Sequence, residues 1–223
     1  MGQGYVATKY QEAGKSQALQ KREAVRVYTS YAPSYDLTNS HDYYFSPRCI
    51  SLNVKKRVAD LDALILDAAC GTGLMGSALK SLGYHNVIGV DVTDAMLKHT
   101  HGKACYRGVV SSDVNYALPF RPKTFDAIVC SSAFIDGILR ANALENLLPY
   151  LKSEGHVFCD IEMLAWSEYG FRELIDHLRV TGRISWLDSQ AAHFFRPAPD
   201  EEFHGFYVSF QAATRDREHD YLI

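Results

Sequence analysis

Short, mainly apolar runs alternate with amphipathic segments through most of the chain. The apolar runs are typical of strands buried on both faces of a sheet, and they occupy residues 63–68, 86–91, 104–110, 125–132 and 156–162. Apolar positions at helical spacing follow in residues 73–83, 92–101, 140–155 and 167–182. Strand–helix alternation of this kind predicts a parallel sheet with right-handed crossovers and helices on both faces.

Two more strand-like segments, residues 183–189 and 205–213, close the chain and are expected to form an antiparallel pair. The predicted fold class is therefore α/β, with a Rossmann-like, seven-stranded, mostly parallel sheet and an antiparallel C-terminal hairpin. In such sheets a ligand binds beyond the carboxyl ends of the strands, next to the first strand.

The N-terminal quarter of the chain has a different pattern. Residues 1–15 are polar and are interpreted as a flexible tail. Residues 16–60 contain two helical stretches separated by a tyrosine-rich segment, and they are interpreted as a helical extension of the domain that spans residues 61–223.

Composition narrows the classes of partner. The 223 residues carry a formal net charge of −3, which argues against a nucleic acid partner. The five cysteines are scattered and odd in number, which indicates reduced thiols in a cytoplasmic protein. The sequence has no apolar run of membrane-spanning length and no secretory signal, so no membrane association is expected. The oligomeric state is left open.

The residues from Gly71 to Gly76 match the G-x-G-x-x-G dinucleotide fingerprint, and Asp91 follows Gly73 by 18 positions. An NAD-binding loop would place a doubly charged pyrophosphate here. Asp67, however, stands at the end of the preceding strand, and a carboxylate there would repel that pyrophosphate by about 4 kcal/mol at a separation of ~4 Å. S-adenosylmethionine has no phosphate and carries a cationic amino group, so it fits this loop better.

Other residues at strand ends complete a nucleoside site. Asp91 can accept hydrogen bonds from both ribose hydroxyls, or it can cap the next helix. Met96 can cover an adenine face or can belong to the core. Asp113 and the backbone N–H of Val114 can bind the adenine edge, although a turn aspartate is the alternative. Ser131 or Ser132 can approach the methionyl part or the substrate.

The stretches LILDAACGTG, VIGVD, SSDVNYALPF, TFDAIV and LLPYLKSEGHVFCDI together resemble the class I S-adenosylmethionine-dependent methyltransferases. VYTSYAPSYDLTN and SSAFIDGILRANALENLLPYLKSEG resemble more closely the Williams-Beuren syndrome region methyltransferase-like group. The resemblance implies an N-terminal lid, with Tyr31 or Tyr35 over the cofactor and Tyr28, Tyr43 and Tyr44 nearby. The cofactor-binding residues that it implies are Asp67, Ala69, Gly71, Gly73, Asp91, Val92, Met96, Asp113, Val114, Ser131 and Tyr35.

The expected function is methyl transfer from S-adenosylmethionine to a small-molecule nucleophile or to a protein. No catalytic side chain is assigned, because the cofactor supplies the reactive group. His41, His193 and His204 are possible bases, and no metal site is expected from His99, His101 and Cys105. The alternatives are a non-catalytic cofactor-binding partner protein and, more distantly, an NAD(P)-dependent oxidoreductase.

Overall fold

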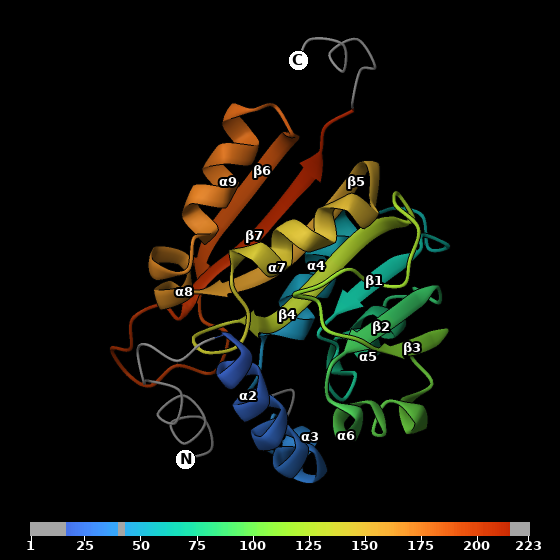
Figure 1. Cartoon of the computed structure of the whole chain (residues 1–223), viewed down its shortest axis with the longest axis vertical. Coiled ribbons are helices and arrows are strands. Elements are labelled where there is room, and N and C mark those ends of the chain that lie inside the picture. Colours follow the sequence, from blue (N-terminus) through green and yellow to red (C-terminus); the bar gives the residue numbers. More distant parts are fainter. Residues whose placement is uncertain (1–16, 40–42, 215–223) are drawn as a thin grey trace.

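A seven-stranded sheet runs through the centre of the computed structural model, which describes residues 17–39 and 43–214 (Figure 1). Its strands are β1 (Ile65–Ala68), β2 (Val87–Asp91), β3 (Gly108–Ser111), β4 (Phe125–Phe134), β5 (Leu151–Glu162), β6 (Ile184–Ala192) and β7 (Gly205–Ala212). Across the sheet the order is β3-β2-β1-β4-β5-β7-β6. The first five strands are parallel, and β7 is antiparallel to both β5 and β6. The predicted fold class is confirmed.

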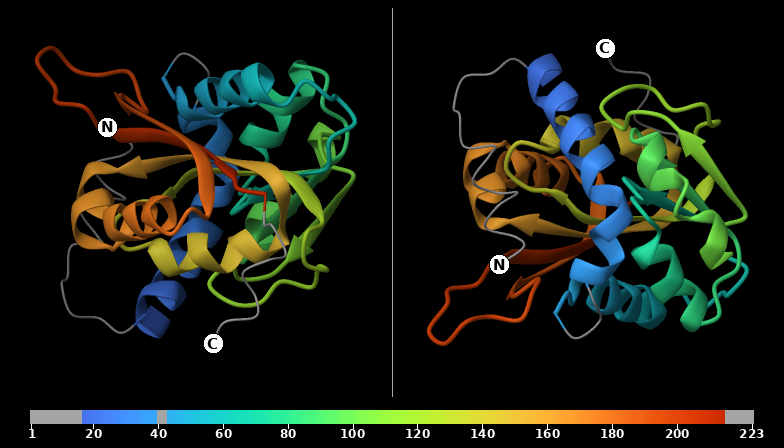
Figure 2. Two further views of the ribbon diagram at one scale, coloured as in Figure 1. Left: turned by 90° about the horizontal axis from the view of Figure 1, so that it is seen from above. Right: turned by 90° about the horizontal axis from the view of Figure 1, so that it is seen from below.

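Helices cover both faces of the sheet (Figure 2). The α-helices are α2 (Gln17–Tyr31), α3 (Tyr35–Thr38), α4 (Ser46–Arg57), α5 (Leu74–Ser81), α6 (Asp94–Leu97), α7 (Ala141–Leu147), α8 (Met163–Glu168) and α9 (Phe171–Val180). Three 3₁₀ turns, η1 (Ala32–Ser34), η2 (His101–Lys103) and η3 (Leu148–Tyr150), connect them. In the part of the chain described, no helix is both long and apolar enough to cross a bilayer.

Two apolar clusters hold these layers together. Ile50 and Val54 of α4 pack with Leu79 of α5 against one face of the sheet. Leu144 of α7 and Phe171 of α9 belong to the cluster on the other face. All five side chains are at most 1% exposed, and burying each contributes about 1.5–3 kcal/mol. The helices are thus fixed on the sheet, and the loops at the strand ends are left to form a site.

Three predicted helices have different limits in the structure, and the one over residues 92–101 is α-helical only in α6, Asp94–Leu97. The segment predicted as helix over residues 140–155 stops being helical at Tyr150, and β5 already begins at Leu151, which pairs with Phe125. Pro149 lies in η3 and cannot donate the hydrogen bond that continues an α-helix. The segment over residues 167–182 is divided at Gly170, whose φ of 80° ends α8 and begins α9.

The N-terminal segment lies across the carboxyl ends of the parallel strands. In Figure 1 the arrowheads of β1 and β4 point toward α2 and α3, and Figure 2 shows α2 crossing that edge. The predicted division of the chain at residue 60 remains a prediction. The predicted tail, residues 1–15, lies outside the described residues.

Candidate functional site

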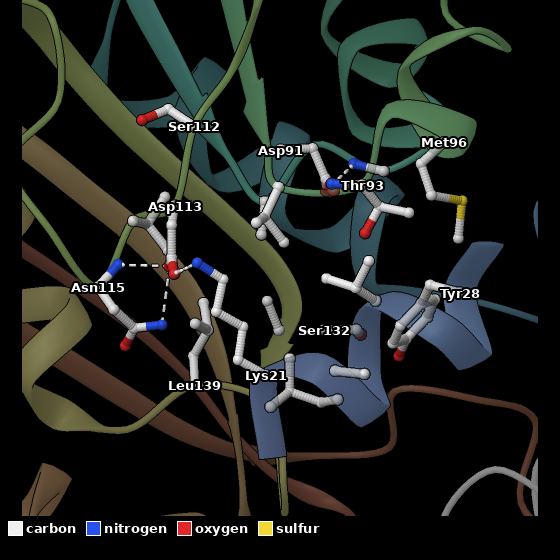
Figure 3. A pocket seen from close by; sticks show the side chains of 18 of the residues that line it. Lys21, Tyr28, Asp91, Thr93, Met96, Ser112, Asp113, Asn115, Ser132 and Leu139 are labelled. Carbon is white, nitrogen blue, oxygen red and sulfur yellow. Dashed lines mark hydrogen bonds and ion pairs between the residues drawn. The ribbon is translucent and has the colours of Figure 1, made fainter. Parts of the chain in front are cut away.

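Two neighbouring cavities open at the carboxyl ends of β1 to β4. The first lies between α2 and the ends of β2, β3 and β4, and it has about 770 Å³ of space, part of it open to solvent (Figure 3). The second lies over the loop after β1. Tyr35, Ala69, Gly71 and Ser131 line both, so the two cavities meet at these residues.

The structure places ten of the eleven predicted cofactor-binding residues on these walls. The first cavity holds Asp91, Val92, Met96, Asp113 and Val114, the second holds Asp67, and the four shared residues complete the ten. Gly73 lines neither cavity. It is the N-cap residue of α5, and its φ of 93° turns the loop into that helix.

The loop after β1 alternates residues in the left-handed region. Ala69 has a φ of 58°, Gly71 of 53° and Gly73 of 93°. Glycine adopts this conformation freely, whereas for alanine it costs about 1–2 kcal/mol. The backbone of Ala69 is therefore in the conformation that favours glycine.

Gly76 has a packing role rather than a ligand role. It lies in α5, and a Cβ atom there would come within 2.4 Å of the Tyr106 ring. The Tyr106 hydroxyl in turn donates a 2.6 Å hydrogen bond to Asp67 Oδ2. The last glycine of the fingerprint therefore makes room for the tyrosine that holds Asp67.

Asp67 is 1% exposed, and its Oδ1 atom has no hydrogen-bond partner among the described residues. Burial raises the pKa of this carboxyl to about 7, although the Tyr106 hydrogen bond acts in the opposite direction. A buried, unpaired carboxylate oxygen is costly unless a donor or a cation meets it. The second cavity therefore suits a positively charged group.

Asp91 closes the first cavity at the end of β2. Its Oδ2 accepts a 2.9 Å hydrogen bond from the Gly71 N–H, and its Oδ1 accepts one of 2.7 Å from the Thr93 N–H. Burial raises the pKa of Asp91, against these two backbone hydrogen bonds. Each carboxylate oxygen keeps a free lone pair, so the pair can still accept two hydroxyl groups.

Asp113 is held by two neighbours (Figure 3). Its Oδ1 accepts hydrogen bonds of 2.9 Å from both the backbone and the side-chain nitrogen of Asn115. Its Oδ2 lies 2.7 Å from the Lys21 Nζ of α2. Partial burial acts to raise the pKa of Asp113, but the Lys21 ammonium and Asn115 together lower it. An adenine amino group would have to share this carboxylate with Lys21.

The N-terminal segment covers the cavities and is tied to the loop after β1. Tyr28 of α2 lines the first cavity, and the Tyr44 hydroxyl lies 3.1 Å from Ser131 Oγ. Asp36 of α3 accepts a 2.6 Å hydrogen bond from the Thr72 hydroxyl and forms a 2.6 Å ion pair with Lys103. We refer to Asp36, Thr72 and Lys103 as the lid latch.

No motif in the sequence pointed to Lys21, Asp36 or Lys103 as part of the site. Each of them lies in a segment that carries no motif, and each pairs with a residue that is distant in the sequence. Only the general expectation of an N-terminal lid pointed toward them.

Comparisons with known proteins agree with this geometry. Residues 65–155 match the model of a methyltransferase domain family. The chain is 28% identical to human methyltransferase-like protein 27 over 159 residues, which cover 69% of this chain and 63% of that protein. It is 32% identical to the bovine 18S rRNA (guanine-N(7))-methyltransferase over 108 residues, which cover 44% of this chain and 38% of that enzyme. The chain thus spans less than two thirds of either relative.

Solved structures show the same fold. A Haloferax volcanii methyltransferase, solved in a complex with the Trm112 methyltransferase activator, aligns with a TM-score of 0.61 and 16% identity over 87% of this chain and 100% of that one. The Synechocystis magnesium protoporphyrin IX methyltransferase, solved with S-adenosylmethionine, aligns with a TM-score of 0.55 and 15% identity over 75% and 79%.

The matched domain, the human relative and the fold together support a class I S-adenosylmethionine-dependent methyltransferase. The closer resemblance to the Williams-Beuren group is supported by the human relative. The cofactor of this family is S-adenosylmethionine. The expectation that this methyltransferase has no nucleic acid partner is wrong, because several relatives are rRNA guanine-N7 methyltransferases. Net charge is a weak guide here, since it does not report how charge is distributed.

The histidines singled out in this methyltransferase lie away from the two cavities. His204 Nε2 lies 3.1 Å from Glu201 Oε1, and the His193 ring packs on Phe203 and His204. His41 is outside the described residues. In residues 17–39 and 43–214, no three His, Cys, Asp or Glu side chains gather as metal ligands.

Proposed function

We propose that the protein transfers the methyl group of S-adenosylmethionine to a nucleophile at the junction of the two cavities. The adenosine part would occupy the first cavity, with its ribose on Asp91 and its adenine near Met96 and Asp113. The methionine part would occupy the second cavity, with its amino group on Asp67.

The observation that carries this proposal is the unpaired Oδ1 atom of Asp67. It is buried beside the loop that would bind phosphates in an NAD enzyme. A pyrophosphate there would face a carboxylate, whereas an amino group would supply its missing partner. The carboxylates of Asp67 and Asp91 thus fit a cationic amino acid joined to a nucleoside, and they disfavour the oxidoreductase alternative.

When bound, S-adenosylmethionine would supply a methyl group activated by the positive charge on its sulfur. The residues of the chain would then bind, orient and exclude water. Asp91 would hold the ribose and Asp67 the amino group, and Ser131 lies where the two cavities meet. Tyr28 and Tyr35 cover the cavities from the lid side and limit the access of water.

The acceptor is proposed by class. RNA stands first, because the sequence relatives whose names give an acceptor, such as the bovine and yeast enzymes, are rRNA methyltransferases. Small molecules and proteins stand second. The similarity to the bovine rRNA enzyme covers 44% of this chain. It is less extensive than the similarity to methyltransferase-like protein 27, which covers 69%.

Transfer of a labelled methyl group tests the proposal. Purified protein is incubated with [methyl-³H]S-adenosylmethionine and, separately, with RNA, protein and small-metabolite fractions of a cell extract. We expect label in one fraction with the wild type and none with Asp91→Ala. Glu173→Gln on the exposed face of α9 is the matched control and should label as the wild type does.

Two results would contradict the proposed activity. Cofactor binding without label in any fraction would favour the non-catalytic partner protein. Label that is unaffected by Asp91→Ala would place the reaction at another site.

A further inference from the structure

A further buried carboxylate, that of Asp160, lies behind the wall of the first cavity. Its side chain is fully buried near the end of β5. Its Oδ1 accepts a 2.5 Å hydrogen bond from the Ser132 N–H, and its Oδ2 accepts one of 2.9 Å from the Ser132 hydroxyl. Ser132 itself lines the first cavity (Figure 3). Only one residue therefore separates this carboxylate from the cavity.

The backbone of β4 is distorted to make this contact. Cys130 pairs with Cys159 and Phe134 pairs with Ile161, so residues 131–133 face the single residue Asp160. Within this bulge Ser132 has a φ of 50°, a left-handed conformation that is unfavourable for serine. Bulges and strained residues of this kind concentrate at functional sites, where they redirect side chains.

Asp160 has no counter-charge in the described part of the chain. No lysine, arginine or histidine described in the structure forms an ion pair with it. The bulge is held by hydrogen bonds that Ser132 donates to residue 160. An uncharged asparagine at position 160 could accept the hydrogen bond from the Ser132 N–H as well. A fully buried carboxylate is therefore more than the bulge requires, and an unpaired buried charge is costly unless a cation lies nearby.

The cofactor of the proposed function would bring such a cation. Its sulfonium joins the adenosine and methionine parts, so it would lie where the cavities meet, beside Ser131 and the Tyr44 hydroxyl that contacts it. Ser132, the next residue, holds Asp160. We propose that Asp160 is the counter-charge of the sulfonium, and that the site thereby binds S-adenosylmethionine in preference to the uncharged product S-adenosylhomocysteine. This inference rests on the proposed function.

The chemical consequence concerns product release. Methyl transfer joins the methyl carbon to a lone pair of the acceptor, and the electrons of the broken S–C bond remain on sulfur. The sulfur then carries no charge. The attraction to Asp160 would be lost at this step, which would weaken the binding of the product relative to the cofactor.

Calorimetric titrations of Asp160→Asn with S-adenosylmethionine and S-adenosylhomocysteine test the proposal. A charge pair separated by one layer of side chains is worth about tenfold in affinity. We expect Asp160→Asn to weaken S-adenosylmethionine about tenfold and to leave S-adenosylhomocysteine unchanged. Asp126→Asn is the matched control, because Asp126 lies near the other end of β4 and pairs with Lys152. It should change neither affinity.

The outcomes are separable. Equal weakening of both ligands by Asp160→Asn, or weakening of neither, would overturn the role of Asp160 and leave the proposed function standing. Failure of the wild type to bind either ligand would instead contradict the proposed function.

A measurement on the wild type covers the case in which Asp160→Asn does not fold. Burial raises the pKa of Asp160, so a nearby cation should displace a proton from it. The titratable groups that face it, Tyr44, Tyr207, Cys130 and Cys159, all have raised pKa values and stay protonated. Calorimetry in buffers of different ionisation enthalpy, at a series of pH values above the ordinary pKa of 3.8, should show more protons released by S-adenosylmethionine than by S-adenosylhomocysteine. Equal release throughout would overturn the proposal.

Discussion

The two halves of the site are built in different ways. At the ends of β1 and β2, Asp67, Gly71 and Asp91 lie within one short strand–loop–helix–strand unit, in which the Gly71 N–H donates a hydrogen bond to Asp91. At the ends of β4 and β5, the wall comes from segments that are distant in sequence. Tyr44 reaches Ser131 across 87 positions, and Asp160 reaches Ser132 across 28.

We expect the first half to determine how tightly the cofactor binds, and the second half to determine the preference for S-adenosylmethionine over S-adenosylhomocysteine. The local half carries Asp67 and Asp91, which we propose to bind the amino group and the ribose of the cofactor. The half assembled from distant segments carries the contact of the lid with Ser131 and the bulge of β4. Substitutions in the local half should therefore have the larger effects on cofactor affinity.

Asp91→Ala should have the largest effect. It leaves the half-buried N–H group of Gly71 and the buried N–H group of Thr93 without their acceptor, and it removes the proposed ribose contacts. We expect the free energy of unfolding to fall by about 2–4 kcal/mol and the affinity for S-adenosylmethionine to fall by about 100-fold or more. Denaturant unfolding and calorimetry measure the two. Asp94→Asn, a nearby control that keeps an acceptor for Ser111, should match the wild type.

Asp67→Asn should come next, with about a 10- to 100-fold loss of affinity, because it removes the charge that faces the amino group. The wild type should also show a pH dependence. The pKa of Asp67 is about 7, so below this pH a cationic ligand must displace a proton. Affinity should rise between pH 5.5 and 7.5 in the wild type, and this rise should be much smaller in Asp67→Asn.

Stability without cofactor should change with pH in the opposite sense. Between the ordinary pKa of 3.8 and the raised value of about 7, folded Asp67 binds a proton that the unfolded chain does not. The contribution of Asp67 to the free energy of unfolding is therefore fully present below this window and is lost as the pH rises through it. If the free energy of unfolding of Asp67→Asn depends on pH in the same way as that of the wild type, the Asp67 carboxyl is not the cause of this dependence.

The lid latch should have a smaller effect. Asp36→Asn weakens the ion pair with Lys103, in which the two side chains are 40% and 21% exposed, so up to about 1 kcal/mol is at stake. We expect a few-fold loss of affinity at low salt, which disappears at 1 M salt, where charges are screened. A loss that persists at high salt would show that Asp36 acts through packing instead.

Ala69→Gly should have the smallest effect, and in the stabilising direction. It relieves the left-handed strain at φ 58° but raises the entropy of the unfolded chain, so the net gain is about 0.5 kcal/mol. Denaturant unfolding measures it. A net loss of stability would show that the alanine methyl group contributes more by packing than its backbone costs.

The sequence predicted the local half of the site well and the other half poorly. The strand ends and the glycine loop could be predicted because the motif, the strand and the next strand lie close together in the chain. Lys21, Asp36 and Asp160 could not, because each acts through a partner that only the folded chain brings near. The left-handed Ala69 was missed for a different reason, since side-chain size alone does not reveal φ.

Calorimetric titration of the purified protein with S-adenosylmethionine and with NAD tests most directly whether the loop after β1 holds an amino acid rather than a pyrophosphate. We predict saturable binding of S-adenosylmethionine and no binding of NAD. Tight binding of NAD, or no binding of S-adenosylmethionine, would contradict the assignment of Asp67 to a cationic amino group.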